Sequence, residues 1–192
     1  MSEMTDRFEM VAAGFDQTVR AVPPQRWTAQ SPCQGWTARD VVGHVVRNYR
    51  SIAAEAAGDE AAGDEAAGDE VGEMGPDEDP VEAWSGAYAR MRELARDPEV
   101  LARSVPGPGG PTPLEQALGT LISMDTHVHK WDLARAVGGD ETLDPEVVAL
   151  TLQMLEPIDD MIRRPGVFGP RLEPPAGADA QTRMLYFLGR RA

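Results

Sequence analysis

Cysteine is nearly absent from this chain of 192 residues, since Cys33 is the single one. One thiol cannot form an internal disulfide, and it cannot supply the sulfur ligands of a cysteine-rich zinc site. The side chains left to hold a metal ion are histidine, aspartate and glutamate, which offer nitrogen and oxygen. Any metal site in this chain is therefore expected to use nitrogen and oxygen ligands.

Long apolar runs are also missing. No stretch approaches the eighteen apolar residues that a membrane span requires, and the first residues, MSEMTDRFEM, are polar rather than typical of a secretory signal. We therefore expect a cytoplasmic protein that has no membrane partner. The chain also lacks a convincing alternation of apolar and polar residues, so no β-strand is predicted.

Clustered basic charge, which nucleic-acid binding requires, is absent as well. The formal net charge is −14, and eleven acidic residues with no basic one lie between Glu55 and Asp79. Without those eleven negative charges the rest of the chain carries −3, so the folded body is nearly balanced. We expect no nucleic-acid partner.

Apolar residues instead recur at three- and four-residue steps, the spacing of amphipathic helices. Cap residues, first-turn prolines and breakers mark where these helices begin and end. The predicted helices are 7–22, 37–52, 80–95, 112–139, 145–155 with an interruption at Pro157, and 180–188. This pattern predicts an all-α fold, a four-helix bundle with short accessory helices, in one domain spanning 1–192.

The sequence AAGDE occurs three times in succession from Ala56 to Glu70. A period of five matches neither a helix nor a strand, and the frequent glycines and one-signed charge oppose stable structure. We predict a flexible acidic insertion at about 56–79 and assign no chemistry to it.

The clearest helix runs from Thr112 to Gly139. Thr112 is a suitable N-cap, Pro113 suits the first helical position, and Glu115 would complete a capping box. Gly138 can take the left-handed conformation that ends a helix. The helix carries an apolar stripe, which consists of Leu114, Leu118, Leu121, Ile122, Leu133 and Ala136.

Asp125 and His129 lie within this stripe, four residues apart, so their side chains point into the same space. An aspartate that faces a core loses hydration unless a positive or hydrogen-bonding group meets it. One interpretation is a hydrogen-bonded Asp–His pair without a metal. The other is a divalent metal site, which requires a further ligand from another helix.

His44 could supply that ligand, because it lies on the core-facing side of the second predicted helix with Val41 and Val45. Considered alone, it could equally be a core histidine bonded to a carbonyl group. Together His44, Asp125 and His129 would leave a divalent ion one open position, the arrangement of catalytic sites. Asp132 would then orient an imidazole by accepting its N–H; alternatively it is an exposed acid paired with Arg135.

Three stretches carry a resemblance to a known family: SPCQGWTARDVVGH, DTHVHKWDLARAVG and FGPRLEPPAGADAQTRMLYFLGR. They resemble the DinB-like metal-binding family related to the N-terminal domain of mycothiol-dependent maleylpyruvate isomerases. The resemblance implies a DinB-like four-helix bundle whose metal, usually taken as zinc, is held by His44, Asp125 and His129. The chain has aspartate where the isomerase has glutamate, and we expect no region like the isomerase's second domain.

The resemblance implies a thiol-dependent transferase or isomerase that acts on a small electrophile, with mycothiol as the thiol co-substrate. Zinc is the expected metal, with nickel or manganese as alternatives. A non-catalytic metal- or ligand-binding bundle with a regulatory or structural role is the rival hypothesis. The sequence does not specify an oligomeric state.

Three further residues have a structural and a functional interpretation. Cys33 is either a packed thiol or a nucleophile for which the sequence shows no base. His127 is expected to face away from the metal ligands and to have a surface or inter-helix role. Trp131 is expected in the core or in the wall of a pocket.

Overall fold

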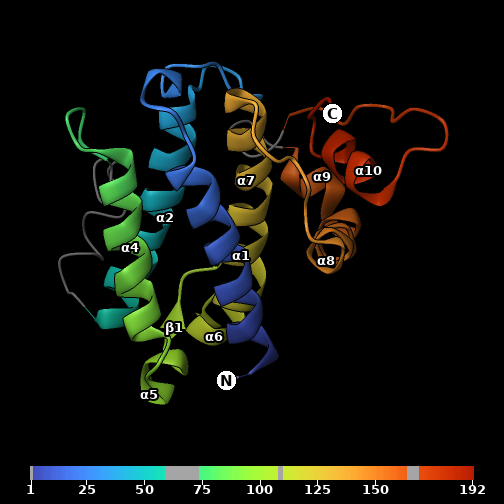
Figure 1. Cartoon of the computed structure of the whole chain (residues 1–192). Coiled ribbons are helices and arrows are strands. Elements are labelled where there is room, and N and C mark those ends of the chain that lie inside the picture. The colour runs from blue at the N-terminus through green and yellow to red at the C-terminus, as the bar shows by residue number, and fades with distance from the viewer. Residues whose placement is uncertain (1, 59–73, 108–109, 164–168) are drawn as a thin grey trace.

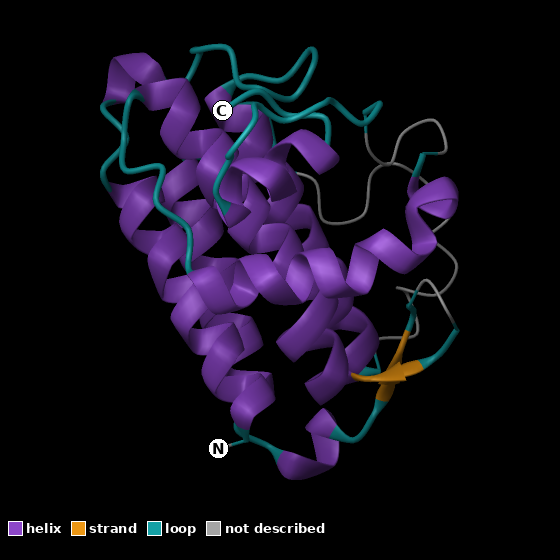
Figure 2. Cartoon of the chain, turned by 90° about the vertical axis from the view of Figure 1, so that its right-hand side faces the viewer, coloured by secondary structure: helices purple, strands orange, loops and turns teal. Residues whose placement is uncertain are grey.

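The computed structural model describes residues 2–58, 74–107, 110–163 and 169–192. Helical segments dominate this part of the chain, as Figures 1 and 2 show. They are α1 (Glu3–Arg20), η1 (Pro24–Arg26), α2 (Ala38–Ala57), α4 (Pro80–Leu94), α5 (Pro98–Leu101), α6 (Leu114–Ala117), η2 (Leu118–Ile122), α7 (Ser123–Val137), α8 (Pro145–Leu155), η3 (Glu156–Ile158), α9 (Asp159–Ile162) and α10 (Ala180–Phe187). The predicted all-α fold class is confirmed.

The four long helices α1, α2, α4 and α7 form the bundle (Figure 1). Helix α1 packs against α4 and α7, and α2 packs against the same two helices from the other side. In Figure 1, α1 and α7 run upward and α2 and α4 run downward. Helices α2 and α7 are therefore antiparallel neighbours, which brings the first half of α2 beside the middle of α7.

Most of the predicted helix starts are confirmed by their caps. The hydroxyl of Thr37 accepts the N–H of Asp40, and the Asp40 carboxylate accepts the N–H of Thr37, which completes a capping box at α2. Asp79 and Asp144 cap α4 and α8, each followed by a proline in the first turn. Helix α1 begins at Glu3, earlier than predicted, because Ser2 and Thr5 form an additional capping box.

The predicted start of the central helix is wrong. Thr112 and Pro113 form the short strand β2 (Thr112–Pro113), which pairs antiparallel with β1 (Ser104–Val105). The Thr112 hydroxyl donates to the carbonyl of Gly110, so it does not cap a helix. This strand pair also corrects the expectation that the chain forms no strand. A two-residue pairing is too short to leave an alternating pattern in the sequence.

The central helix is also interrupted by the π-helical segment η2 before α7 begins. Gly119 lies where η2 meets the start of α1, and a Cβ on this residue would overlap Met4 Cβ. Arg7 donates to the Gly119 carbonyl at 2.7 Å. A glycine is therefore required at this crossing of the two chain segments. The predicted end is confirmed, since Gly138 has a φ of 78°.

The apolar residues form two clusters. The larger one fills the bundle and includes Phe8, Phe15, Tyr49, Trp84 and Leu118. Trp27 and Trp36, from the loop before α2, pack against its edge. The second cluster joins the other face of α7 to α8, α9 and α10, at the right of Figure 1. Helix α7 is thus covered on both sides, which explains how it can hold polar side chains away from water.

The bounds expected for the acidic insertion, about 56–79, need correction at both ends. Residues 59–73 lie outside the described residues. Ala56 is fully buried at the end of α2, and the carbonyls of Ala56 and Ala57 accept Arg103. At the other edge Arg39 donates to the carbonyls of residues 75, 76 and 78. Both edges therefore belong to the packed body.

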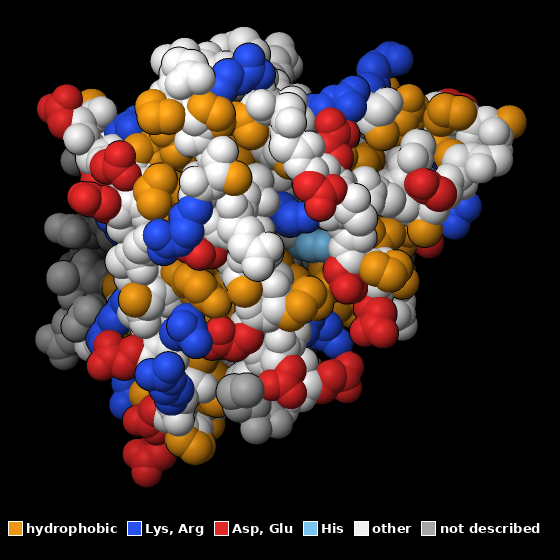
Figure 3. Space-filling model, in the orientation of Figure 1, with side chains coloured by type: hydrophobic (Ala, Val, Ile, Leu, Met, Phe, Trp, Pro, Cys, Tyr) orange, Lys and Arg blue, Asp and Glu red, His pale blue; other side chains and the backbone are white. Residues whose placement is uncertain are grey.

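One face of the molecule is mixed in charge. Figure 3 shows acidic and basic side chains interspersed over one face, with no large area of a single sign. Among the described residues, no helix has the length and apolar character needed to cross a membrane.

Candidate metal centre

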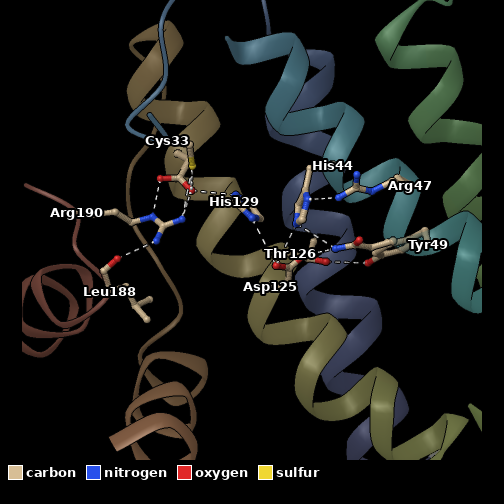
Figure 4. Close-up of polar contacts among 11 residues, drawn as sticks. Cys33, His44, Arg47, Tyr49, Asp125, Thr126, His129, Leu188 and Arg190 are labelled. Carbon is tan, nitrogen blue, oxygen red and sulfur yellow. Dashed lines mark hydrogen bonds and ion pairs between the residues drawn. The ribbon is translucent and has the colours of Figure 1, made fainter. Parts of the chain in front are cut away.

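The three predicted ligands, His44, Asp125 and His129, meet between α2 and α7 (Figure 4). Asp125 Oδ1 lies 3.5 Å from His44 Nε2 and 3.5 Å from His129 Nε2. The three donor atoms all lie within 4.8 Å of one another. Metal–donor bonds of about 2.0–2.2 Å in tetrahedral geometry separate donor atoms by about 3.4 Å. The donor set and its spacing therefore fit a divalent ion such as zinc.

The charges of this cluster depend on one another. Burial raises the pKa of Asp125, but His129 and His44 outweigh this effect and hold it well below its ordinary value. Burial lowers the pKa of His129, and the carboxylates of Asp125 and Asp132 reverse this and raise it well above its ordinary value. The carboxylate of Asp125 is thus ionised, which is the form that binds a cation.

Asp132 fixes the orientation of His129. His129 Nδ1 donates to Asp132 Oδ2 at 2.9 Å, and this bond directs Nε2 toward Asp125 and His44. Asp132 is fully buried, so the alternative prediction of an exposed acid paired with Arg135 is wrong. Arg135 instead pairs with Glu141. Asp132 therefore acts on the imidazole, as the first interpretation expected.

Arg190, which the sequence analysis did not single out, completes this contact from the end of the chain. Its Nε donates to Asp132 Oδ1 and its Nη2 to Asp132 Oδ2, both at 2.8 Å. Its side chain is 10% exposed, so the pair is shielded from water. Burial raises the pKa of Asp132, and the Arg190 guanidinium with His129 more than reverses it and lowers that pKa.

Cys33 is half-buried and contacts the carboxylate of Asp132 as well. Its Sγ donates to Asp132 Oδ2 at 3.3 Å, and Arg190 Nη2 lies 3.6 Å from the sulfur. The thiol is therefore not an isolated packing residue: together with Arg190 it surrounds the acid that orients His129. The motif SPCQGW gave no signal of this contact, because Asp132 is 99 residues further along the chain.

His44 has two neighbours on its own helix. Asn48 Nδ2 lies 3.1 Å from His44 Nε2 and donates to Asp125 Oδ2 at 3.0 Å. Arg47 Nη2 lies 3.3 Å from His44 Nδ1 (Figure 4). Loading a metal onto His44 Nε2 therefore requires the Asn48 amide to withdraw from that nitrogen, which leaves Asn48 on Asp125.

An aromatic ring covers one side of the centre. Trp36 stacks on His129 with a centroid distance of 5.8 Å and lies 5.0 Å from the His44 ring. On the core side the Tyr49 hydroxyl is 3.2 Å from Thr126 Oγ1, and burial raises the pKa of Tyr49. Trp36 thus packs against both imidazoles, while the Tyr49 hydroxyl bonds to the residue next to Asp125.

The other predictions for α7 concern its opposite face. His127 is buried, and its Nε2 accepts the N–H of Asp144 at 2.9 Å, so the inter-helix role is confirmed and the surface alternative is wrong. Burial lowers the pKa of His127 to about 4, which keeps it neutral. Trp131 is fully buried in the second cluster, as expected for a core residue.

The family follows from a match over most of the bundle. Residues 8–134 match the family described as the mycothiol maleylpyruvate isomerase N-terminal domain. The chain belongs to this family. The matched region includes all three candidate ligands and Asp132, whereas Arg190 lies beyond it.

Known relatives and structures agree with this assignment. The uncharacterized proteins MT0763 and Rv0738 of Mycobacterium tuberculosis, from strains CDC 1551 / Oshkosh and ATCC 25618 / H37Rv, are each 31% identical over 173 residues, which is 83% of this chain and 82% of theirs. The crystal structure of the mycothiol-dependent maleylpyruvate isomerase and that of a histidine-to-alanine mutant have TM-scores of 0.59 and 0.61 at 16% identity. They cover 79% and 80% of this chain, and 69% and 68% of the isomerase chain. The likeness confirms the DinB-like fold.

Proposed function

We propose that this chain is a divalent-metal-dependent enzyme that uses mycothiol as a thiol co-substrate, in a transfer or isomerisation reaction on a small electrophile. The observation that carries this proposal is the meeting of His44, Asp125 and His129, three donors from two antiparallel helices, with spacings of 3.5 Å from Asp125 to each histidine. The mycothiol-dependent isomerase shares the fold, and its name supplies the thiol.

His44, Asp125 and His129 would hold the ion. Two neutral imidazoles and one carboxylate suit zinc, and nickel and manganese also accept nitrogen and oxygen ligands. A bound divalent ion lowers the pKa of a coordinated thiol and so supplies a thiolate at neutral pH. We place the reaction in the cytoplasm, where low-molecular-mass thiols are kept reduced.

The protein's own groups would prepare this centre for a substrate. Asp132 accepts the Nδ1 proton of His129, so an ion at Nε2 would displace only the proton that the raised pKa of His129 keeps on that nitrogen. Asn48 donates to the second oxygen of Asp125, which keeps Oδ1 facing the histidines. Trp36 covers the two imidazoles and limits the access of water on its side.

The first test is the metal content of the freshly purified protein, measured by mass spectrometry under native conditions. About one divalent ion per chain is expected, and His44→Ala and His129→Ala should each remove it. His127→Gln is the matched control, because it removes the third imidazole and its amide oxygen can still accept the Asp144 N–H. Full occupancy in both ligand variants would refute the assignment.

The second test is turnover. The metal-loaded protein should consume mycothiol with a panel of small electrophiles at a saturable rate, and removal of the metal should abolish it. A protein that binds one metal yet turns over no thiol would instead be the non-catalytic metal-binding bundle.

A further inference from the structure

A second group of metal-ligating side chains shares His129 with the candidate metal centre. It consists of Cys33, His129 and Asp132, whose donor atoms all lie within 4.8 Å of one another, and we call it the Cys33 cluster. In Figure 4, Cys33 lies on one side of His129, and His44 and Asp125 lie on the other. Asp132 is fully buried and His129 is 6% exposed, whereas Cys33 is half-buried. The sulfur is thus the member of the cluster that solvent reaches.

Three donors converge on one oxygen of Asp132. This oxygen, Oδ2, accepts His129 Nδ1 at 2.9 Å, Arg190 Nη2 at 2.8 Å and the Cys33 thiol at 3.3 Å. A carboxylate oxygen offers about two lone-pair directions, so the three donors compete for it. Oδ1 is held separately by Arg190 Nε at 2.8 Å. Positive charge therefore gathers at Oδ2, and the guanidinium can release Oδ2 without leaving Asp132.

A divalent ion can replace two of these donors. A thiol and an imidazole N–H each become a ligand when they lose their proton to solvent, so an ion with two positive charges takes the place of two protons. The net charge of the buried cluster then stays the same, which avoids the cost of an uncompensated charge in the interior.

The spacing of the donor atoms suits such an ion. Bonds of about 2.0–2.3 Å to sulfur, nitrogen and oxygen in tetrahedral geometry place the donor atoms about 3.4–3.6 Å apart. Cys33 Sγ and His129 Nδ1 lie 3.3 and 2.9 Å from Asp132 Oδ2. Each of the two therefore needs to move by about 0.5 Å or less.

The ligands of the two sites differ in softness. The candidate metal centre offers nitrogen and oxygen alone, whereas the Cys33 cluster has a thiolate sulfur in place of the His44 nitrogen. Thiolate ligands select soft ions, and carboxylate ligands suit harder ions such as manganese. The two sites are therefore expected to prefer different ions.

Both sites depend on the same imidazole ring. His129 directs Nε2 to Asp125 Oδ1, 3.5 Å away, and Nδ1 to Asp132 Oδ2. A neutral imidazole binds an ion through one nitrogen and keeps a proton on the other. An ion at Nδ1 therefore leaves a proton on Nε2 and withdraws this ligand from the candidate metal centre.

We propose that the Cys33 cluster is a second metal site, selective for thiophilic divalent ions softer than zinc, such as cadmium. Its occupation excludes a metal from the candidate metal centre, because the two sites compete for His129. Arg190 Nη2 leaves Asp132 Oδ2 when the ion binds, while its Nε keeps the contact with Oδ1. The proposal concerns binding alone, so it does not depend on the reaction that the centre catalyses.

The single cysteine makes the test specific. Cadmium bound to a thiolate absorbs in the ultraviolet through charge transfer from sulfur, and Cys33 is the sole cysteine of the chain. The reduced, metal-free protein is titrated with cadmium chloride. One absorbing ion per chain is expected. Cys33→Ser should abolish the absorption, and circular dichroism verifies that this variant folds.

Further variants distinguish the cluster from a lone thiol. His129→Gln should weaken the absorbing cadmium site at least tenfold. His127→Gln is the matched control and should leave it unchanged, because His127 contacts Asp144 on the opposite face of α7. Equal cadmium affinity in His129→Gln and the parent, or one ion for every two chains, would overturn the proposal, since a single or shared thiol would then suffice.

His44→Ala separates the two sites, because it removes a ligand from the candidate metal centre alone. This variant should keep the cadmium absorption. Manganese, added up to the concentration at which cadmium saturates the site, should not reduce it. Loss of the absorption in this variant would show that cadmium needs the candidate metal centre, and a reduction by manganese would overturn the selectivity.

Nuclear magnetic resonance of the imidazole nitrogens tests the exclusion directly. In parent protein labelled with nitrogen-15 and loaded with one equivalent of cadmium-113, the metal should couple to His129 Nδ1, and Nε2 should carry a proton. The spectrum of His129→Gln assigns these signals. Coupling to Nε2, or to neither nitrogen, would overturn the proposal and leave the proposed function unaffected.

Discussion

Replacing Asp132 by asparagine tests the coupling between the candidate metal centre and the end of the chain. The substitution preserves the shape of the side chain and removes its charge. Arg190 would then keep a buried guanidinium opposite a neutral amide, and its guanidinium would also contact the Leu188 carbonyl and the Cys33 sulfur. His129 Nδ1 could still donate to the amide oxygen, so the imidazole loses a charged acceptor but not every acceptor.

The expected cost follows from the burial of both partners. Asp132 is fully buried and Arg190 is 10% exposed, and removing one partner from such a pair costs about 3–5 kcal/mol. The retained amide oxygen favours the lower end, about 3 kcal/mol. For a chain of this length each kcal/mol lowers the melting temperature by about 2–4 °C, so a fall of about 6–12 °C is expected.

Thermal unfolding of the metal-free protein measures this cost without a contribution from bound ions. Glu93→Gln is the control, since it neutralises an ion pair with Arg90 whose side chains are 69% and 49% exposed and which contributes little. Arg190→Met and the double variant, Asp132→Asn with Arg190→Met, complete a double-mutant cycle. The double variant should lose less stability than the sum of the losses in the two single variants.

A change below 2 °C in Asp132→Asn, or strict additivity in the cycle, would refute the reasoning. The same variant should bind zinc about 10–100-fold more weakly than the parent in a chelator competition, because the histidine ligand loses its anionic partner. An unchanged affinity for zinc would show that the contact between Asp132 and His129 stabilises the fold but does not contribute to metal binding.

Three further outcomes are expected. Asp125→Asn should weaken zinc binding in a chelator competition, since it removes the anion; an unchanged affinity would leave two histidines and favour the non-catalytic hypothesis. Gly119→Ala should lower the free energy of unfolding by about 1–3 kcal/mol in urea titration, because its Cβ would overlap Met4. Gly86→Ala, in open space, should raise it by up to about 1 kcal/mol, and equal effects would contradict the close approach. Deleting residues 61–70, two of the three AAGDE repeats, should leave the melting temperature and the metal content unchanged, because these repeats are rich in acidic residues and glycine. A fall of several degrees in melting temperature would show that the repeats contribute to the stability of the fold.

The candidate ligands could be predicted because each lies on a long helix with a regular apolar stripe. Asp125 and His129 share a face by their spacing alone, and His44 lies on the stripe that α2 turns toward α7. Periodicity therefore determined which side chains point inward. The need for a third ligand from another helix paired the two helices, and the resemblance implies the same three residues.

The start of the central helix could not be predicted in the same way. TPLE has every local feature of a capped helix, but Thr112 pairs with Val105 and gives its hydroxyl to a loop carbonyl. The local preference of such a segment for a capped helix start is worth from a few tenths of a kcal/mol to about 2 kcal/mol. Strand pairing with a neighbouring segment overrides this preference. The π-helical segment η2 lies where Gly119 contacts α1, a contact between distant parts of the chain that the local sequence does not encode.

The contacts of Arg190 and Cys33 with Asp132 could not be predicted from sequence patterns. Asp132 is 58 residues from one and 99 from the other, and neither belongs to a periodic pattern that includes it. A buried aspartate on a core face does, however, demand a cation or several donors. Applied to Asp132 as it was to Asp125, that requirement predicts a missing partner, although it cannot name which arginine supplies it.

The arrangement around Asp132 explains why a costly buried ion pair is present at this point. An ion pair that only stabilised the fold could be replaced as a whole by apolar residues at little cost, as is common for buried pairs. Asp132 instead holds three donors from three parts of the chain, namely His129 of α7, Cys33 of the loop before α2, and Arg190 after α10. An apolar substitute would keep the packing but would release the imidazole and the C-terminal segment at once. The Asp132–Arg190 pair therefore attaches the segment after α10 to α7, and the same carboxylate orients His129. Through this pair, the helices outside the bundle contribute to the geometry of the site within it.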